Sequence, residues 1–224
     1  MIYQGSNGNL EYIPYHVSDF DCNKKDYSLH LGENYFSLDK VKLNLNTEKI
    51  NLNGTILSND LKPWPVTLFE PGCMGWYAYV PTMECFHGIL SMNHTLNGQL
   101  TLNNSKLNFD GGKGYIEKDW GRNFPKNWIW AQSNHFQESE LSVSISLATI
   151  PWKKSHFSGY IVGVQHKNTL YRFTPYRRSK ITHLCYDGTF LEWHLKSGGI
   201  EIQFKLERGT KSGLLYAPDE TDMV

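Results

Sequence analysis

The chain has 224 residues, of which 40% are hydrophobic, 14% aromatic and 20% charged, and its 22 basic residues balance its 22 acidic residues. This composition excludes a disordered chain, which would be poor in apolar and aromatic residues. With no basic run longer than two residues, the sequence also lacks the electrostatic footprint of a nucleic-acid-binding protein. We therefore expect a folded protein whose partner is not a nucleic acid.

Alternation of apolar and polar residues with a period of two runs along much of the chain. Residues 41–53 alternate around a polar turn at 47–49, and residues 100–109 repeat the pattern around a turn at 103–105. Residues 141–147 alternate with serine on one face, and residues 191–206 alternate around a Ser-Gly-Gly turn. These patterns predict antiparallel strands and hairpins with one polar face, and no stretch shows a helical stripe of three turns. The fold class they indicate is an all-β sandwich or barrel.

A less regular centre, rich in glycine, proline and tryptophan, separates the hairpin-rich segments. It extends from residue 63 to residue 152, and the regular alternation returns on both sides of it. We interpret this as two antiparallel β units joined near residues 121–127. The predicted units are residues 1–122 and residues 123–224.

The sequence also suggests a compartment. No stretch approaches the roughly 18–20 consecutive apolar residues of a membrane span, and the first residues do not follow the pattern of a signal peptide. The cysteines at 22, 73, 85 and 185 are far apart, with no C-x-x-C pair. We expect free, buried thiols and a cytoplasmic protein.

The segment at 114–121 reads Gly-Tyr-Ile-Glu-Lys-Asp-Trp-Gly. As an extended strand it places Tyr115, Glu117 and Asp119 on one face, with the two acidic residues about 7 Å apart. If that face looks into an apolar cavity, desolvation and mutual repulsion raise the pKa of at least one carboxyl and supply a general acid near neutral pH. The alternative is a solvated sheet edge, over which Lys118 extends its charged end into water.

The segment at 128–136 combines large aromatic side chains with amides. As a strand, one of its faces carries Trp128 and Trp130 followed by Gln132 and Asn134, whose amides require hydrogen-bond partners when buried. Apolar walls with a few placed polar groups are typical of a binding pocket. Core packing with satisfied amides stays open as the alternative.

A third segment, residues 71–94, holds Trp76, Glu84, His87 and His94 among glycine and cysteine residues. The spacing of these histidines and acids fits no standard zinc pattern. We therefore expect no metal ion and interpret the histidines as pocket or core residues.

Other catalytic motifs are absent from the sequence. It contains neither the G-x-S-x-G of hydrolases, nor G-x-G-x-x-G, nor a Walker loop, and its cysteines lack the local signature of a nucleophile. Carboxyl, histidine and tyrosine side chains among aromatic ones remain. This inventory allows catalysis by acid and base alone, with no bound cofactor.

With these residues in view, the chain resembles the tocopherol cyclase family. The resemblance is carried by PGCMGWYAYVPTMECFHGILSMNH at 71–94, GKGYIEKDWGRNFPKNWIWAQSNHF at 112–136 and IPW at 150–152, and extends more weakly over most of the chain. The family is similar in turn to lipocalin-like hydratases of carotenoid metabolism, whose Tyr-x-Asp-x-x-Trp-Gly pattern places an acid at the position of Glu117. The resemblance implies two lipocalin-like β units with an apolar pocket between or inside them.

Two differences from the family qualify the resemblance. Family members usually begin with further strands and continue beyond the last residue here, so we expect β units that are incomplete at both termini. The composition, rich in asparagine and lysine, suggests a bacterial relative rather than a plant plastid protein. Its substrate therefore need not be a tocopherol precursor.

The reaction that the resemblance implies is closure of a prenylated hydroquinone to a chromanol. An acid protonates the alkene of the tail, and the phenol oxygen captures the tertiary cation, without redox change or cofactor. On this resemblance we assign Glu117 or Asp119 as the acid, the other as electrostatic partner or base, and Tyr115 as proton relay. The residues expected to line the cation site or bind substrate are Trp76, Glu84, His87, Trp120, Trp128, Trp130, Gln132 and Asn134.

Other functions stay open. A lipocalin-like protein can carry a lipid or isoprenoid without catalysis, because the fold does not fix the function. An isoprenoid hydratase would use the same cation, with water in place of the phenol, and an aromatic platform on a β-sandwich can bind a glycan. In the cyclase, carrier and hydratase interpretations the partner is an apolar small molecule. We infer no obligate protein partner and regard peripheral contact with a membrane as compatible with the sequence.

Overall fold

The computed structural model of the chain describes residues 2–4, 10–23, 25, 27–122, 125, 127–152 and 155–208. Over these ranges the chain consists of β-strands with three short 3-10 turns and no α-helix, so the predicted all-β class is confirmed. All strand pairs are antiparallel, and no sheet in the described ranges closes on itself into a barrel. None of the described helical turns is long and apolar enough to cross a membrane.

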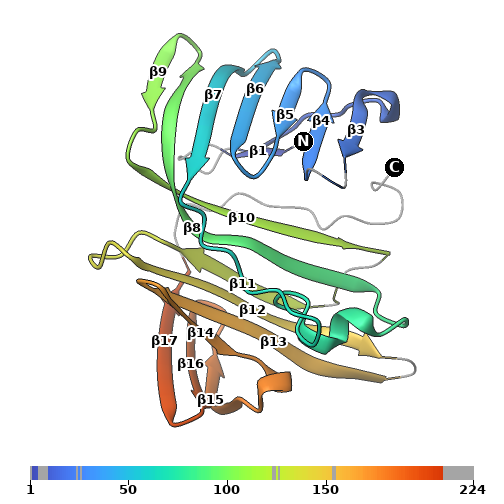
Figure 1. Cartoon of the computed structure of the whole chain (residues 1–224), viewed down its shortest axis with the longest axis vertical. Helices are drawn as coiled ribbons and strands as arrows, with labels where there is room; N and C mark the ends of the chain where they lie inside the picture. Colours follow the sequence, from blue (N-terminus) through green and yellow to red (C-terminus); the bar gives the residue numbers. More distant parts are fainter. Residues whose placement is uncertain are drawn as a thin grey trace.

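An eight-stranded sheet makes up the upper part of the molecule in Figure 1, in the order β10-β8-β7-β6-β5-β4-β3 with β9 paired to β8. The longest strand, β8, has 18 residues and continues from this sheet into the middle of the molecule, where β10 accompanies it (Figure 1). The strands are β3 (Phe20–Asn23), β4 (Ser28–Leu31), β5 (Asn34–Phe36), β6 (Lys40–Asn46), β7 (Asn51–Asn59), β8 (Cys85–Leu102), β9 (Ser105–Asn108) and β10 (Gly112–Gly121).

The remaining strands form three smaller sheets. In Figure 1, β11, β12 and β13 run beside β8 and β10, and β14 to β17 lie below them. The four-stranded sheet contains β11 (Trp128–Ser133), β12 (Leu141–Trp152), β13 (Ser155–His166) and β14 (Thr169–Phe173). The three-stranded sheet contains β15 (Lys180–Tyr186), β16 (Phe190–Ser197) and β17 (Ile200–Glu207), and β1 (Ile2–Gln4) pairs with β2 (Leu10–Tyr12). The 3-10 turns are η1 (Val17–Asp19), η2 (Gly75–Tyr79) and η3 (Pro175–Arg177).

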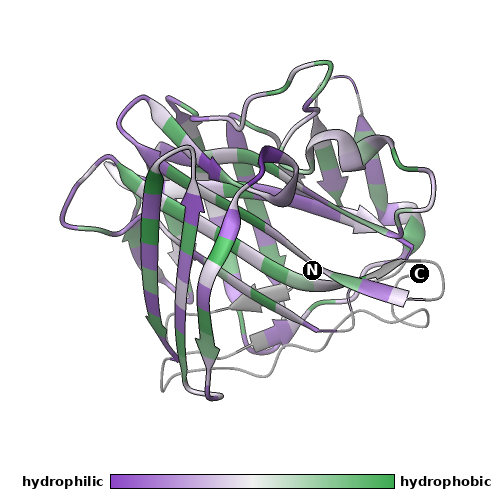
Figure 2. Cartoon of the chain, turned by 90° about the horizontal axis from the view of Figure 1, so that it is seen from below, coloured by the Kyte–Doolittle hydropathy of each residue, from purple (hydrophilic) through white to green (hydrophobic). Residues whose placement is uncertain are grey.

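The three hairpins predicted from the alternation are present. At the second turn, Asn103 and Asn104 have φ of 45° and 70°, the left-handed conformations of a tight hairpin turn whose twist matches that of the strands. Figure 2 shows the alternation as green and purple bands along the strands. The residue pairs that flank the three turns are Asn46–Asn51, Leu102–Ser105 and Ser197–Ile200.

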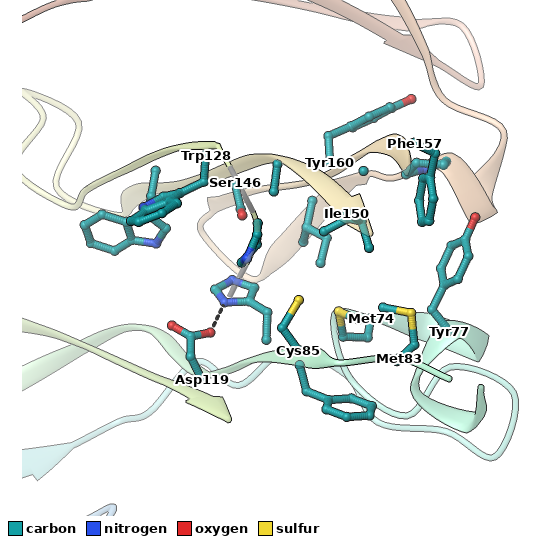
Figure 3. Close-up of a pocket in the computed structure, with 18 of the residues that line it drawn as sticks. Met74, Tyr77, Met83, Cys85, Asp119, Trp128, Ser146, Ile150, Phe157 and Tyr160 are labelled. Carbon is teal, nitrogen blue, oxygen red and sulfur yellow. Dashed lines mark hydrogen bonds and ion pairs between the residues drawn. The ribbon is translucent and has the colours of Figure 1, made fainter. Parts of the chain in front are cut away.

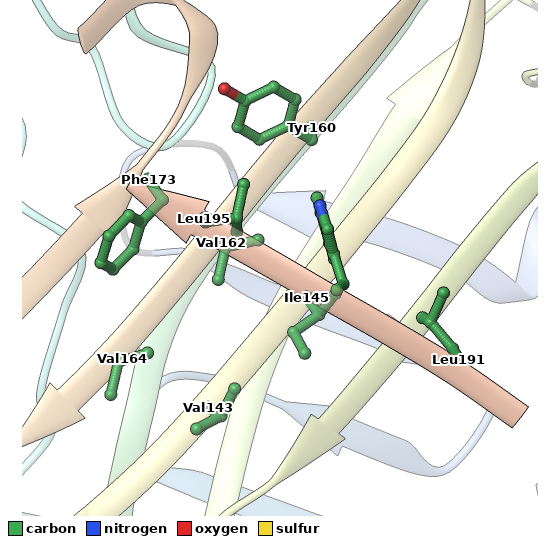
Figure 4. Close-up of a cluster of buried hydrophobic side chains, with 9 residues drawn as sticks. Val143, Ile145, Tyr160, Val162, Val164, Phe173, Leu191 and Leu195 are labelled. Atoms are coloured by element: carbon green, nitrogen blue, oxygen red, sulfur yellow. The ribbon is translucent and has the colours of Figure 1, made fainter. Parts of the chain in front are cut away.

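The largest hydrophobic core lies between the four-stranded and three-stranded sheets, where β16 crosses β12 and β13 (Figure 4). Trp193 of β16 is fully buried, and its ring meets that of Tyr160 edge-on at a centroid distance of 5.8 Å. Burial of each large apolar side chain contributes about 1.5–3 kcal/mol. Because Val143 and Ile145 turn one face of β12 into this core, its alternate residues face the opposite way.

The opposite face of β12 carries the serines, and it is not in solvent. Ser142 and Ser144 are 0% and 1% exposed, and the Ser142 hydroxyl donates to the carbonyl oxygen of Met92 in β8 at 2.6 Å. Such small polar side chains allow β12 to approach β8 closely while satisfying buried backbone groups. The four-stranded sheet is therefore covered on both sides, by the core on one and by β8 on the other.

Sheet membership changes where the sequence predicted a boundary between two units. Strands up to Gly121 belong to the eight-stranded sheet, and strands from Trp128 onward belong to the four- and three-stranded sheets. The division into units 1–122 and 123–224 stays a prediction, since β8 and β12 are in contact across it.

All four cysteines are free, as expected. Cys73 is buried and Cys85 half-buried, but Cys22 and Cys185 are exposed. The expectation that all the thiols are buried is therefore wrong for these two, which lie on the outer strands β3 and β15.

Candidate functional site

A cavity of about 500 Å³ lies between β8 and β10 on one side and β11, β12 and β13 on the other. This volume falls within the range of about 300–1,000 Å³ that small-molecule pockets occupy. Figure 3 shows Met74, Met83 and Cys85 facing Ser146 and Ile150 across the space. Apolar and aromatic side chains make up most of the lining, and no lysine or arginine of the described residues is among it.

The strand β10 reaches this cavity through an irregular segment. Its pairing with β8 shifts register between Gly114 and Ile116 and again between Ile116 and Glu117, so Tyr115 has no partner in the ladder. Such bulges change the direction of side chains and are common beside functional sites. The Tyr115 hydroxyl donates to Glu117 Oε2 at 2.5 Å and lies 3.0 Å from Ser144 Oγ. Tyr115 therefore connects the acid face of β10 to the serine face of β12.

Glu117 is the acidic group most affected by the cavity. Burial raises the pKa of its carboxyl, and this effect outweighs the opposing hydrogen bond from Tyr115 and the nearby His87. The Trp130 indole N–H also donates to Glu117 Oε2, at 3.1 Å. Both donors meet the same oxygen, and no donor among the described residues meets Oε1. The site thus holds a carboxyl whose pKa is raised by burial and whose Oε1 meets no donor among the described residues.

Tyr115 itself stays a neutral donor at physiological pH. Burial raises the pKa of its phenol, and the neighbouring Glu117 raises it further. The hydroxyl can therefore donate to the Glu117 carboxylate without losing its proton.

Asp119 pairs with His87 on the neighbouring strand. The two residues are directly opposite each other in the β10–β8 ladder, and His87 Nδ1 lies 2.6 Å from Asp119 Oδ1 (Figure 3). Because a carboxylate can only accept a hydrogen bond, His87 Nδ1 must carry the proton that it shares with Asp119. In a neutral imidazole this leaves the lone pair on Nε2. His87 Nε2 is buried and has no hydrogen-bond partner among the described residues. Candidate ligand atoms of His87, Glu117 and Asp119 all lie within 4.8 Å of one another, so a potential acid and a potential base are adjacent.

Aromatic side chains surround this group. Trp120, Trp128 and Trp130 all line the cavity and are about half exposed. Trp120 stacks on Phe86 of β8 at 5.4 Å, with 9° between the ring planes. Lys118 Nζ lies 5.0 Å from the Trp120 ring. The cationic side chain of β10 therefore lies over an aromatic ring and does not line the cavity.

Four of the predicted substrate-binding residues are not part of the cavity lining: Trp76, Glu84, Gln132 and Asn134. Asn134 is buried, and its amide donates to the Gly114 carbonyl oxygen at 3.0 Å, which ties the end of β11 to β10. Gln132 has a buried Nε2 with no partner in the part of the chain that the structure describes. Trp76 stacks on Tyr77, which does line the cavity, at 4.1 Å. Direct substrate contacts by these four residues stay predictions.

The structure adds lining residues that the sequence analysis did not single out. One end of the cavity is formed by η2 and η3, which contribute Tyr77 and Tyr176. The Tyr176 hydroxyl donates to the Cys73 carbonyl oxygen at 2.8 Å. Gly75 has φ of +56°, and a Cβ there would lie 2.7 Å from the Tyr176 ring, so glycine allows the two turns to meet. The Pro-Gly and Gly-Trp pairs of this segment were the only sequence signal for such a turn.

The described residues contain one group that could hold a metal ion, and it is the same His87, Glu117 and Asp119. The set considered from the sequence was Glu84, His87 and His94. His94 is buried, its ring lies 3.0 Å from Ser91 Oγ, and burial lowers its pKa. The expectation of no metal ion stays a prediction.

Fold and site together define an all-β protein with an apolar cavity that contains an acid–base group. The chain belongs to the tocopherol cyclase-like family, since the family model of that description matches residues 60–222. A probable chloroplastic tocopherol cyclase of Oryza sativa subsp. japonica is 27% identical over 115 residues, 50% of this chain and 24% of that protein. A chloroplastic tocopherol cyclase of Zea mays is 26% identical over 106 residues, 46% of this chain and 22% of that protein. The matches thus span about a quarter of these relatives' length, and no solved structure matches the chain.

Proposed function

We propose that this protein closes a prenylated hydroquinone to a chromanol by protonating the alkene of its tail. Membership of the tocopherol cyclase-like family and the names of the two plant relatives support this reaction class. The observation that carries the proposal is the Glu117 carboxyl, which lines an apolar cavity and whose pKa is raised by burial. Raising the pKa of a carboxyl in an apolar site makes it a better general acid near neutral pH, which is what alkene protonation requires.

In the first step, Glu117 transfers its proton from Oε1 to the less substituted alkene carbon. The π electron pair forms the new C–H bond, and a tertiary cation remains on the adjacent carbon. The carboxylate charge that develops is stabilised by the hydrogen bonds from Tyr115 and Trp130 to Oε2. Because these donors are in place before the reaction, they favour the transition state over the ground state.

The cation is stabilised by the surrounding aromatic rings. Trp120, Trp128 and Trp130 are within the lining, and a ring face contributes about 0.5–2 kcal/mol to a nearby cation. No lysine or arginine of the described residues is part of the lining, although Lys118 lies over the Trp120 ring.

In the second step, the phenol oxygen attacks the tertiary carbon and forms the C–O bond of the ring. Its proton passes to His87 Nε2, and Asp119 stabilises the imidazolium through Nδ1. The proton then returns to Glu117, so the reaction is an isomerisation with no net change in protons or electrons. The carbon protonated first and the phenol oxygen are close together in the forming six-membered ring. One nitrogen of His87 and one carboxylate oxygen of Glu117 lie within 4.8 Å of each other, so both side chains can reach this region of the substrate.

The test is incubation of the protein with a phytylated hydroquinone in mild detergent in deuterium oxide, followed by mass spectrometry. We expect a chromanol with one new deuterium on carbon, and at least a hundredfold less product from Glu117→Gln. Glu201→Gln is the matched control, because Glu201 is an exposed acid on β17, outside the cavity. Equal turnover by Glu117→Gln and the wild-type chain would refute the assignment of the acid.

The other outcomes identify the alternatives. A product with added water would indicate an isoprenoid hydratase, and tight binding of the quinol without turnover would indicate a carrier. The two lipocalin-like units, divided after residue 122, and a cytoplasmic location in a bacterial cell are part of the same proposal. The reaction proposed for Glu117 does not depend on the division into units or on the location of the protein.

A further inference from the structure

The segment between β7 and η2 exposes apolar side chains to an unusual degree. Val66, Leu68 and Phe69 are 74%, 77% and 82% exposed, more than any other large apolar side chain of the described residues. Exposure of this extent means that little protein lies against these side chains on any side. They therefore form a projecting tip, and they are more exposed than the tryptophans that line the cavity.

The tip is the end of a hydrogen-bonded turn. Val66 and Pro71 form a β-bridge across the turn, the Thr67 N–H donates to the Glu70 carbonyl oxygen at 2.9 Å, and the Glu70 N–H donates to Thr67 Oγ1 at 3.0 Å. Backbone groups of the turn are thus paired, and the two residues between Thr67 and Glu70 are Leu68 and Phe69. The two residues at the end of the turn are therefore both large and apolar.

The turn is also fastened to the body of the protein. The Glu70 carboxylate accepts from Arg172 Nη1 at 2.8 Å and lies 3.2 Å from Arg177 Nε. On the other side, the Tyr79 hydroxyl donates to the Leu68 carbonyl oxygen at 2.7 Å. These contacts hold the apolar tip outward, where a loose loop would fold its apolar side chains back onto the protein.

Aromatic residues of η2 connect the tip with the lining of the cavity. Tyr79 and Trp76, both in η2, are 58% and 50% exposed. Trp76 stacks on Tyr77 at 4.1 Å, and Tyr77 lines the cavity beside Met74 and Met83 (Figure 3). The residues of η2 therefore contact both the tip, through the Tyr79 hydroxyl, and the cavity, through Tyr77.

The charges around the tip favour an anionic surface. Residues 64–79 contain one ionisable acid, Glu70, and no basic residue, while the contacting segment 172–178 contributes Arg172, Arg177 and Arg178 and no acid. Three guanidinium groups thus oppose one carboxylate. Each basic residue close to an anionic membrane contributes about 1 kcal/mol to binding.

We propose that Val66, Leu68 and Phe69 insert into the surface of an anionic lipid bilayer and hold the cavity against it. Trp76 and Tyr79 then lie at the level of the headgroups, which aromatic side chains with a polar end prefer. A second protein is a poorer occupant, because a stable protein interface buries about 800 Å² on each partner and a three-residue tip offers much less. The proposal that the tip binds a membrane is argued from the structure alone. Only the identity of the lipid that enters the cavity depends on the proposed function.

The test is flotation of the full chain with vesicles of phosphatidylcholine and phosphatidylglycerol. We expect the double variant Leu68→Ser/Phe69→Ser to lose at least tenfold in vesicle partitioning, equivalent to about 1.4 kcal/mol. The matched control is Val17→Ser/Phe20→Ser, which changes two side chains that are 64% and 51% exposed, far along the chain in η1 and β3. Circular dichroism establishes that each variant keeps the β-sheet spectrum of the wild-type chain.

Equal partitioning of the tip variant and the wild-type chain overturns the proposal. A wild-type dimer that the tip variant converts to a monomer, without vesicle binding, also overturns it and identifies a protein interface. Turnover separates this proposal from the proposed function: the tip variant should keep turnover of a short-tailed quinol in detergent and lose at least tenfold with a long-tailed quinol in vesicles. Vesicle binding without turnover of either quinol contradicts the cyclase and leaves the membrane surface supported.

Discussion

Tyr115→Phe separates the two effects that the Tyr115 hydroxyl has on Glu117. The substitution keeps the ring and removes only the Oη, which donates to Glu117 Oε2 at 2.5 Å and contacts Ser144 Oγ. The hydrogen bond stabilises the carboxylate form of Glu117, which is the form produced when the proton leaves. The variant should therefore donate its proton less readily at every pH.

The size of the loss follows from the geometry. A hydrogen bond to a charged group contributes about 1.5–3 kcal/mol, so removing this one should lower kcat/KM by about ten- to a hundredfold. The loss is not complete, because the Trp130 N–H still donates to the same oxygen. The same hydrogen bond lowers the pKa of Glu117, and its removal raises that pKa further. A general acid works below its pKa, so the alkaline decline in activity should move to higher pH.

The assay is the pH profile of chromanol formation for the wild-type chain, for Tyr115→Phe and for Tyr186→Phe. The last is the matched control, because the Tyr186 hydroxyl donates to the Gly188 carbonyl oxygen in an exposed turn at 3.2 Å. An unchanged rate for Tyr115→Phe, or an alkaline decline that moves to lower pH, would show that Tyr115 does not act on the acid.

Two further predictions concern the same group. Burial raises the folded-state pKa of Glu117 above its unfolded value, so its cost to stability is absent well below the unfolded pKa and grows as pH rises through the folded one. Glu117→Gln should therefore melt at a higher temperature than the wild-type chain at about pH 8, by about 2–4 °C for each kcal/mol of added unfolding free energy. At about pH 3 the two should melt at the same temperature. Calorimetry showing no difference at pH 8 contradicts the burial argument. Treatment with EDTA should leave turnover unchanged, because the proposed proton transfers use the side chains of His87, Glu117 and Asp119 without a cation between them. Activity lost to EDTA and restored by a divalent ion would identify a metal enzyme.

The hairpins could be predicted because their determinants are local. Apolar residues at every second position and a short polar turn are enough to set the pairing of β6 with β7 and of β16 with β17. The same reasoning placed Tyr115 and Glu117 on one face, and the hydrogen bond between them agrees with it. The packing of the sheets on one another could not be predicted from the sequence, because alternation does not determine which face of a strand meets which sheet.

The parts of the site that the sequence did not predict are those that depend on contacts between distant segments. Ser144 was part of a polar face in the sequence, yet it is buried because β8 covers β12. The pairing of His87 with Asp119 depends on the register of β8 and β10 over 32 residues of separation, through two register shifts that no local pattern announces. Asn134 was interpreted as a pocket amide, and its partners, the carbonyl of Gly114 and the side chain of Asn93, come from other strands.

The two walls of the cavity come from opposite sides of the connection between Gly121 and Trp128. During synthesis on the ribosome, β8 and β10 therefore emerge before β11, β12 and β13. Until those later strands arrive, the acid face of β10 is open to water, and neither the Trp130 indole nor the Ser144 hydroxyl is present to meet Glu117 and Tyr115. The shifted pKa of Glu117 is thus acquired late, when the second wall covers the first. The environment that raises the pKa of Glu117 is therefore complete only after residues from both sides of this connection have folded together.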